Sequence, residues 1–305
     1  MTPQVDVDAP RNGSERAAGG WDAGLRDGLP FCLVVFAIAR LATSITLALG
    51  VGTHAPDPSA LAAGSPPQPF TLPATPGIHN AIDGLQRWDA AWYLWIASDG
   101  YGGPSDDRPA FFPGYPIAID AAGVLTAGNA PAAATLVSNL CYLLSLVVLY
   151  GLTSAELGPH HSRRAVALFA ALPGSLFFLA PYSESLFLLL ALLAFWWTTR
   201  GRPGKVVAVG LAAGLVRVMS LALVPGLAWS WWIQRRERSL RSILAVVSPA
   251  IGVCAYLLWW AVRSDALTPF RAQSFWGRTL TAPPATIIRG VQFAVGPSSE
   301  VPASI

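Results

Sequence analysis

Long apolar runs separated by short polar connections dominate the chain after residue 28. They cover about 29–51, 131–153, 164–181, 184–200, 205–233 and 242–263, and a weaker run covers 111–127. Several of these runs approach the roughly 20 residues that a helix needs to cross the hydrocarbon core of a bilayer. The pattern therefore predicts an all-α protein, a polytopic bundle of transmembrane helices.

Composition and charge agree with this pattern. Of the 305 residues, 53% are hydrophobic and 12% are charged, against about 25% charged in a typical soluble domain. The net charge is +3, but the basic residues form short clusters between apolar runs, so no nucleic-acid partner is expected. Cys32, Cys141 and Cys254 all lie in apolar runs and are expected to be small buried side chains, without a disulfide or metal.

The positions of the arginines orient the first segments. Residues 1–28 are polar and are predicted to form a disordered cytoplasmic tail. Three arginines precede the apolar run 29–51, which is expected to be an uncleaved signal anchor whose C-terminal end emerges outside. The remainder, 29–305, is predicted to be a single membrane domain, and its outer loop, 52–130, is predicted to carry interfacial helices.

Three later basic clusters are predicted to face the cytoplasm: Arg163-Arg164; Arg200, Arg202 and Lys205; and Arg235, Arg236, Arg238 and Arg241. Placing all three clusters in the cytoplasm determines whether the number of membrane crossings before each cluster is odd or even. If 111–127 crossed the membrane, the first cluster would fall outside. The run 111–127 is therefore predicted to be interfacial or re-entrant.

The run 205–233 has a basic cluster at each end, so it is expected to leave the cytoplasmic side and return to it. Its length is too short for two full spans. Two shortened helices that meet near Arg217 satisfy both conditions, because non-helical backbone at membrane depth is tolerated inside protein or beside a wet cavity. A single long, tilted span is the alternative that the pattern leaves open.

Candidate chemistry is concentrated in 87–116, RWDAAWYLWIASDGYGGPSDDRPAFFPGYP, where carboxylates and aromatic residues crowd together. Trp88, Trp92 and Trp95 recur at i, i+4 and i+7, which predicts one face of an interfacial helix. Asp89 is either the N-cap of this helix or a general base at the mouth of a cavity.

The other charged residues of this stretch have simpler interpretations. Arg87 is suited to contact a phosphate headgroup, and Asp99 in SDGYGG is suited to a turn. Asp106 and Asp107 have the oxygen ligands that a divalent cation needs, although a solvated loop tip is the simpler prediction. No metal or other cofactor is required by the sequence.

Further polar groups fall on the outer side of the predicted topology. Glu184 begins a helix in PYSESLF, where a carboxylate also suits the helix dipole. Arg217 stands alone in apolar sequence and needs a partner, either Glu184 or an anionic lipid phosphate. Arg271, Gln273 and Arg278 form a last outer cluster that serves either substrate binding or interfacial anchoring.

Several blocks of the chain are similar to one known family. RWDAAWYLWIASDGY followed by AFFPGYP resembles the first outer loop of the PIG-V type mannosyltransferases; PYSESLFLLLALLAFW, GLAAGLVRVMSLALVPGL and SDALTPFRAQSFWGR resemble later blocks in the same order. The resemblance covers about 80–280. It implies a bacterial, especially actinobacterial, member of the GT-C class of integral membrane glycosyltransferases. Family members continue for several more spans, so the chain is expected to be short at its C-terminus.

The resemblance implies an inverting transfer of mannose from a polyprenyl-phosphate donor to a hydroxyl of a lipid-linked or protein acceptor. The reaction would take place at the outer face of a bacterial plasma membrane. The resemblance leaves open whether a divalent cation takes part. The resemblance places the catalytic base at Asp89. The substrate contacts that it implies are stacking of Trp88 and Tyr101 on sugar faces and stabilisation of the leaving phosphate by Arg217, Arg271 or Arg278. Glu184 would either orient Arg217 or bind sugar hydroxyls.

Two other classes stay open from the sequence. A transporter predicts polar residues spread around a site at the membrane midplane, whereas here they gather on one side. A degenerate, inactive relative of the GT-C enzymes is the second alternative. The enzyme hypothesis requires Asp89, Glu184 and Arg217 to line one outward-facing cavity, within about 20 Å of one another, the scale of a single ligand site.

Overall fold

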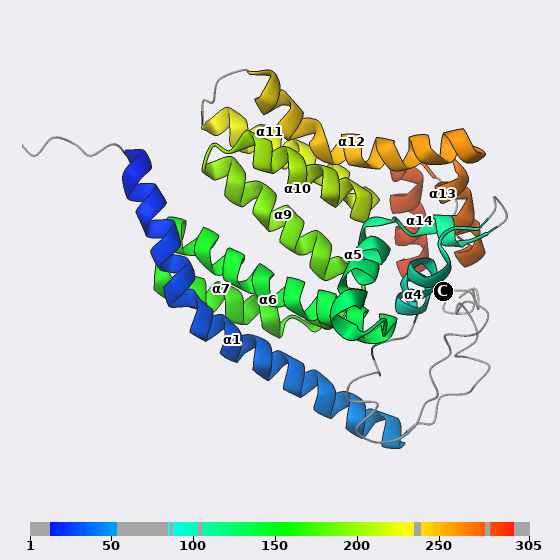
Figure 1. The fold of residues 1–305 in the computed structure, drawn as a ribbon, viewed down its shortest axis with the longest axis horizontal. Coiled ribbons are helices and arrows are strands. Elements are labelled where there is room, and N and C mark those ends of the chain that lie inside the picture. The colour runs from blue at the N-terminus through cyan, green and yellow to red at the C-terminus, as the bar shows by residue number, and fades with distance from the viewer. Residues whose placement is uncertain are drawn as a thin grey trace, which may run out of the picture.

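The computed structural model of the protein describes residues 13–53, 85, 88–102, 106–234, 239–277 and 281–295. Every regular element within these ranges is a helix, which confirms the all-α prediction (Figure 1). Three of these helices contain apolar stretches long enough to cross a bilayer: Asp27–Leu49 in α1 (Gly13–Thr53), α6 (Ala130–Leu157) and α12 (Leu240–Arg263). The polytopic membrane class predicted from the sequence is therefore confirmed.

Helix α1 begins earlier than the apolar pattern predicts. The sequence predicted a disordered tail over 1–28, yet residues 13–28 already belong to the helix, while residues 1–12 lie outside the described ranges. The glycines of GSERAAGG are poor helix formers, but extending an existing helix avoids the cost of nucleation. The interpretation of 29–305 as a single membrane domain stays a prediction.

The helices of the bundle run back and forth between two ends. Helices α9 (Ser183–Thr199), α10 (Pro203–Val216) and α11 (Leu223–Ile233) lie between α6 and α12 (Figure 1). The α6–α7 and α9–α10 connections, the end of α11 and the start of α12 lie at the left end of the bundle in Figure 1, and α4, α5 and α13 lie at the opposite end.

The described members of the three basic clusters share that left end. They are Arg163 and Arg164 near the start of α7 (Pro159–Ala171), Arg200, Arg202 and Lys205 at the α9–α10 connection, and Arg241 at the start of α12. Arg235, Arg236 and Arg238 lie outside the described residues. The predicted membrane crossings require these clusters to lie at the same end of the bundle, as they do. The side of the membrane on which this end lies stays a prediction.

The run 205–233 is a helical hairpin broken at Arg217. Helix α10 ends at Val216, Arg217 is extended (φ −156°, ψ 143°), and the 3-10 helix η4 (Val218–Ala222) leads into α11. The prediction of two shortened helices meeting near Arg217 is correct. The alternative of one long, tilted span is wrong, because the helical hydrogen-bond pattern is interrupted at this residue.

The run 164–181 is not the straight span that its apolar sequence predicts. Helix α7 and the following segment Pro173–Leu179 are bent by 75°. That segment comprises η3 (Pro173–Ser175) and α8 (Leu176–Leu179). Pro173 lacks an N–H and disfavours a helical residue before it, and Leu172 is indeed extended (φ −62°, ψ 137°). A proline inside an apolar run thus converts one predicted span into a bent pair.

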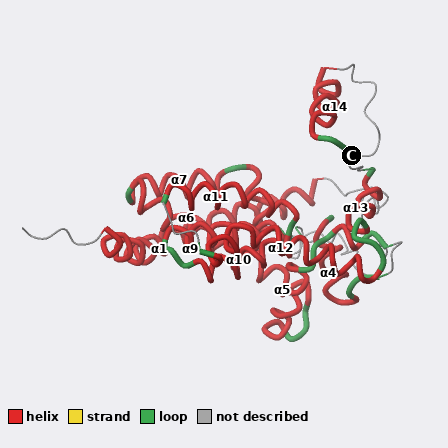
Figure 2. The backbone as a smooth tube through the Cα atoms, turned by 90° about the horizontal axis from the view of Figure 1, so that it is seen from above, coloured by secondary structure: helices red, strands yellow, loops and turns green. Residues whose placement is uncertain are grey.

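Short helices form the end of the bundle opposite the basic clusters. The weak run 111–127 becomes α5 (Gly114–Gly123) and η2 (Val124–Thr126), too short to cross a bilayer, as the parity condition predicts. The other elements in this part of the chain are α4 (Asp89–Asp99), η1 (Arg108–Ala110), α13 (Thr268–Arg271), η5 (Ala272–Trp276) and α14 (Pro283–Val295). In Figure 2, α5 projects from one side of the bundle and α14 stands apart from it.

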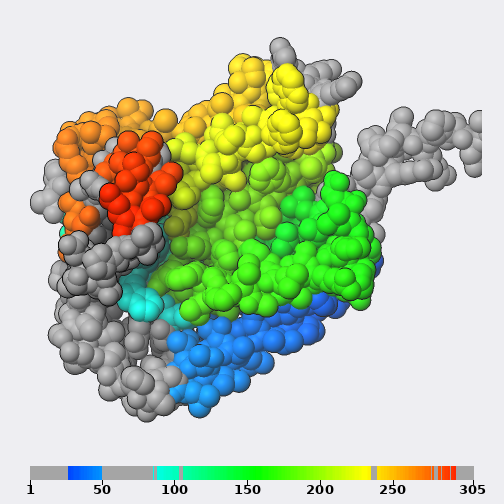
Figure 3. Space-filling view, turned by 180° about the vertical axis from the view of Figure 1, so that it is seen from behind, coloured from blue at the N-terminus to red at the C-terminus, as the bar shows by residue number. Residues whose placement is uncertain are grey.

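Large apolar side chains are exposed on the outside of the bundle. On α1, Val34, Ile38, Leu41 and Ile45 recur along one exposed face, and Val262 is exposed on α12. Figure 3 shows the molecule from behind, where α7, α9, α10 and α11 form a continuous surface above α1. Exposed apolar side chains of this kind suit contact with lipid chains, in agreement with the membrane class.

Helices α10 and α12 approach closely because glycines face each other. A Cβ atom added at Gly214 would lie 2.3 Å from the carbonyl oxygen of Pro249, and one added at Gly252 would lie 2.3 Å from that of Leu211. Both clashes are with backbone, which cannot move as a side chain does. This contact fixes the end of α10, and therefore Arg217, against α12.

The glycine contact gives a stability prediction. Gly214→Ala is expected to lower the free energy of unfolding in detergent by about 1–3 kcal/mol, the usual cost of overpacking. Gly204→Ala is the matched control in the same helix, because nothing lies within 4 Å of its added Cβ. Its effect is expected to stay below about 1 kcal/mol. Equal effects of the two substitutions would contradict the close contact.

Candidate active site

A cavity of about 460 Å³ lies at the end of the bundle opposite the basic clusters. Its walls come from α4, the segment around η1, the break between α10 and η4, and the α13–η5 region. Its volume is in the range usual for small-molecule sites. The residues that line it are Asp89, Tyr93, Ala110, Phe111, Phe112, Val216, Arg217, Val218, Met219, Pro269, Phe270 and Gln273.

Asp89 is the first residue of α4 and is half-buried. The N-cap is Trp88, which has a positive φ of 51° and makes no side-chain cap bond. The interpretation of Asp89 as an N-cap is therefore wrong by one position. A carboxylate at the start of a helix is stabilised in its ionised form by the helix dipole, and an ionised carboxylate is the form that accepts a proton.

Arg217 is held by Glu184, one of its two predicted partners, but Glu184 itself, contrary to the prediction, is not among the residues that line the cavity. Nη1 of Arg217 lies 2.6 Å from Oε1 of Glu184 and donates a 2.9 Å hydrogen bond to Oγ of Ser183. Among the described residues, Nη2 and Nε of Arg217 have no hydrogen-bond acceptor. The guanidinium is thus anchored through one nitrogen at the wall of the cavity, and its other donors remain available to an anion.

Tyr93 connects the same group of residues to α4. Its hydroxyl lies 2.7 Å from Oγ of Ser183, and its side chain is only 5% exposed. Burial raises the pKa of the Tyr93 phenol, so it stays protonated and able to donate. The sequence-based site missed both Tyr93 and Ser183. Tyr93 could have been found, because it follows Asp89 by one helical turn on the same face.

The remaining predicted site residues fall into three groups. Gln273 lines the cavity, and its Nε2 donates a 3.4 Å hydrogen bond to the carbonyl of Ala110. Trp88 is 63% exposed and is not among the lining residues. Arg271 also lies outside the lining and pairs with Asp265 at 2.6 Å. Arg87 and Arg278 lie outside the described residues.

Tyr101 packs elsewhere and does not line this cavity. Its hydroxyl donates a 2.6 Å hydrogen bond to the carbonyl of Phe111, and its ring contacts Tyr256, Trp259 and Trp260 at centroid distances of 5.5–5.9 Å. It borders a neighbouring, mostly apolar cavity of about 510 Å³. The predicted role of Tyr101 in stacking on the sugar of the Asp89 site is therefore not supported, because the ring is already used in packing.

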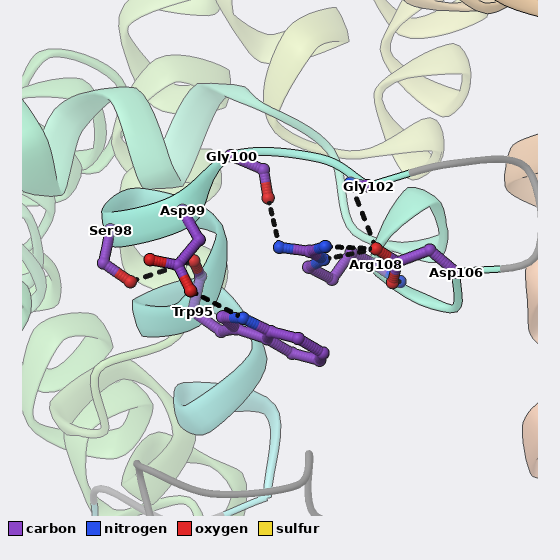
Figure 4. Close-up of polar contacts among 7 residues, drawn as sticks. All are labelled: Trp95, Ser98, Asp99, Gly100, Gly102, Asp106 and Arg108. Atoms are coloured by element: carbon purple, nitrogen blue, oxygen red, sulfur yellow. Dashed lines mark hydrogen bonds and ion pairs between the residues drawn. The ribbon is translucent and has the colours of Figure 1, made fainter.

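The loop after α4 is closed by Arg108 (Figure 4). Its Nε donates a 2.5 Å bond to Oδ2 of Asp106, its Nη1 donates to the carbonyl of Gly100 at 2.8 Å, and its Cζ lies 4.2 Å from the ring centroid of Trp95. Asp99 was expected in a turn, but it is the last residue of α4, where it accepts a 3.0 Å bond from Nε1 of Trp95 one helical turn earlier.

Asp106 is not the solvated loop tip that the sequence predicts. Its side chain is 12% exposed, and besides Arg108 it accepts backbone N–H groups from Gly102 and Arg108 at 3.0 and 2.9 Å. Burial and the charge of Asp106 raise the pKa of Asp107. The oxygens of Asp106 are already used by protein donors, and no cluster of metal-ligating side chains occurs in the described part of the chain.

The comparisons with known proteins point to one family. The family described as Mannosyltransferase (PIG-V) matches residues 33–231, a range that contains Asp89, Ser183, Glu184 and Arg217. GPI alpha-1,6-mannosyltransferase 2 of Mus musculus is 30% identical over 184 residues, which are 56% of this chain and 36% of the mouse protein. The human protein of the same name is 34% identical over 135 residues, covering 41% of this chain and 27% of the human one.

A nematode relative gives a similar match. GPI mannosyltransferase pigv-1 of Caenorhabditis elegans is 30% identical over 147 residues, 42% of this chain and 21% of that protein. The chain therefore spans between 21% and 36% of the length of these relatives. No solved structure gives a significant match.

The fold and the polar cavity at one end define a class, a polytopic helical membrane protein with a candidate site on one side of the bundle. The family match covers most of the described helices. The chain belongs to the PIG-V mannosyltransferase family.

Closure of the loop by Arg108 can be tested by amide hydrogen exchange. Arg108→Ala is expected to raise the exchange rate of the Gly102 amide by about 10-fold, because the carboxylate that accepts this amide loses its charged partner. Arg263→Ala removes a similar cation–π contact, at 4.6 Å from Trp259, outside the loop. Unchanged exchange at Gly102 in Arg108→Ala would mean that Arg108 does not hold the loop.

Proposed function

We propose that this protein transfers mannose from a polyprenyl-phosphate donor to a hydroxyl of a lipid-linked or protein acceptor, with inversion at the sugar C1. The observation that carries the proposal is that a carboxylate, Asp89, and an arginine with available donors, Arg217, line one cavity. The names of the relatives, all GPI mannosyltransferases, support the sugar and the reaction class.

The proposed reaction is a single displacement. The acceptor hydroxyl attacks C1 of mannose from the face opposite the phosphate, which forms the new C1–O bond and breaks the bond from C1 to the phosphate oxygen. The acceptor proton passes to the carboxylate of Asp89, and the bonding electron pair leaves with the polyprenyl phosphate. Because attack and departure take place on opposite faces, the configuration at C1 is inverted.

Arg217 is the group best suited to the leaving phosphate. A guanidinium binds phosphate through parallel, charge-assisted hydrogen bonds, and Nη2 and Nε have no acceptor among the described residues. Charge that develops on the phosphate during departure would be stabilised by these fixed donors. The proposed step needs no cofactor, because the guanidinium supplies the positive charge.

The position of the cavity supports a reaction on the outer face of a bacterial plasma membrane. The cavity is at the end of the bundle opposite the basic clusters, and such clusters favour the cytoplasmic side. The hydrocarbon chain of a polyprenyl phosphate would remain among the membrane lipids, against the apolar exterior of the bundle. Any acceptor must then present its hydroxyl at the outer surface.

The proposal is tested by transfer from labelled polyprenyl-phosphate mannose in membranes that contain the protein. Asp89→Asn is expected to lower the transfer rate by about 10²–10⁴-fold, the usual effect of losing a general base. Asp99→Asn is the matched control, since it changes a carboxylate of the same helix that is bonded to Trp95 instead of lining the cavity. It is expected to retain most of the activity.

Two results would contradict the proposal in different ways. Equal transfer by the wild type and Asp89→Asn would exclude Asp89 as the base. Absence of transfer by the wild type, in membranes that hold the folded protein, would favour a transporter or a degenerate relative of the enzymes.

A further inference from the structure

Ser183 uses its hydroxyl for contacts between distant segments. A serine at the start of a helix usually caps that helix, but the N-cap of α9 is Tyr182, which makes no side-chain cap bond. The hydroxyl of Ser183 instead contacts Arg217 at 2.9 Å and Tyr93 at 2.7 Å. These partners are 34 and 90 residues away in the sequence.

The donors and acceptors of this chain of contacts are partly fixed by chemistry. Because a guanidinium has no acceptor, Ser183 Oγ must accept the bond from Arg217. The hydroxyl retains one proton and a second lone pair, so it meets the Tyr93 hydroxyl either as donor or as acceptor. Ser183 is fully buried, and Tyr93 is nearly so, which makes the loss of either partner costly.

The ion pair with Glu184 does not fix the direction of Arg217 by itself. It involves one nitrogen, Nη1, at 2.6 Å, and both side chains are partly exposed, 31% for Arg217 and 25% for Glu184. A guanidinium held at one nitrogen by one carboxylate can still rotate about that contact. Ser183 accepts a bond from the same nitrogen, Nη1, and two acceptors on one planar nitrogen fix the plane in which Nη2 and Nε lie.

Tyr93 links the same contact to the proposed base. It follows Asp89 by four residues in α4, so both side chains lie on one face of a short helix, and both line the cavity. Ser183 therefore joins two segments: α4, which carries the base, and the break after α10, which carries the phosphate-binding group. The two groups must be placed together for an in-line displacement.

We propose that Ser183 and Tyr93 are positioning residues. Their buried hydrogen bonds fix the position of Arg217 relative to α4, the helix that carries Asp89. The inference rests on the proposed function and goes beyond it, because it assigns a role to two residues that the proposed reaction itself does not use. If Ser183 and Tyr93 only stabilised the fold, their substitution would not specifically weaken phosphate binding by Arg217. If they position Arg217, substitution should weaken that binding.

The test measures two quantities on purified protein in detergent: binding of a short-chain polyprenyl phosphate by native mass spectrometry, and transfer from labelled polyprenyl-phosphate mannose. Ser183→Ala is expected to weaken binding by about 10-fold, since Arg217 loses a charge-assisted contact. It is expected to lower kcat by about 10- to 100-fold through misplacement of the reacting groups. Ser183→Thr keeps the hydroxyl and should restore most of both.

Tyr93→Phe provides a second, independent variant. Tyr93 and Ser183 act through the same hydrogen bonds, so their substitutions should not be additive. The double variant Tyr93→Phe, Ser183→Ala should lower kcat about as much as one substitution does, and far less than the product of the two single effects. The matched control is Tyr115→Phe. The Tyr115 hydroxyl makes an equally buried 2.6 Å contact with Ser138, and Tyr115 does not line the cavity.

The control is expected to lower thermal stability while phosphate binding stays within about twofold of wild type. If Ser183→Ala binds and transfers like wild type, or if Tyr115→Phe reduces binding as strongly, the positioning role is overturned while the proposed function stands. If the folded wild type neither binds the polyprenyl phosphate nor transfers mannose, the proposed function fails and the inference fails with it.

Discussion

Arg217 carries a charge in a part of the chain that is otherwise apolar, and the arrangement of the outer end of the bundle depends on how that charge is paired. A lone arginine at membrane depth must find an anion and a polar surface. Here it finds Glu184 at 2.6 Å and Ser183 at 2.9 Å, both in the first turn of α9. The pairing requires α10 to end at Val216, so that the extended residue after it can reach across to the start of another helix.

The same break also creates the cavity. With α10 and α11 shortened, backbone that would otherwise be helical becomes part of a wall that faces Asp89 and Gln273. The close contact of Gly214 with α12 holds the end of α10 in place, and α5 and the loop closed by Arg108 complete the surroundings of α4. Because the α10–α11 hairpin is too short for two full spans, it breaks at Arg217, and this break places Arg217 in the same cavity as Asp89.

Much of this could be predicted from the sequence, because the responsible signals are local or countable. Helices α1, α6 and α12 follow from the lengths of their apolar runs, and the break at Arg217 follows from counting residues between two basic clusters. The bend at Leu172 was missed because a single proline leaves a run of apolar residues looking continuous. Tyr101 was misplaced because an aromatic residue suits both packing and sugar stacking. Ser183 was missed because a hydrogen bond across 90 residues leaves no periodic pattern, whereas the spacing of Tyr93 from Asp89 was a usable signal.

Asp89 and Arg217, which line one cavity, are proposed to serve the same substrate. A crystal structure of the protein with a non-transferable phosphonate analogue of polyprenyl-phosphate mannose would decide whether they do. We expect the phosphonate within about 3 Å of the Arg217 nitrogens, the length of a charge-assisted hydrogen bond, and C1 of mannose between that group and the Asp89 carboxylate. A phosphonate bound away from Arg217, or a sugar with Asp89 on the same face as the phosphonate, would contradict the proposal.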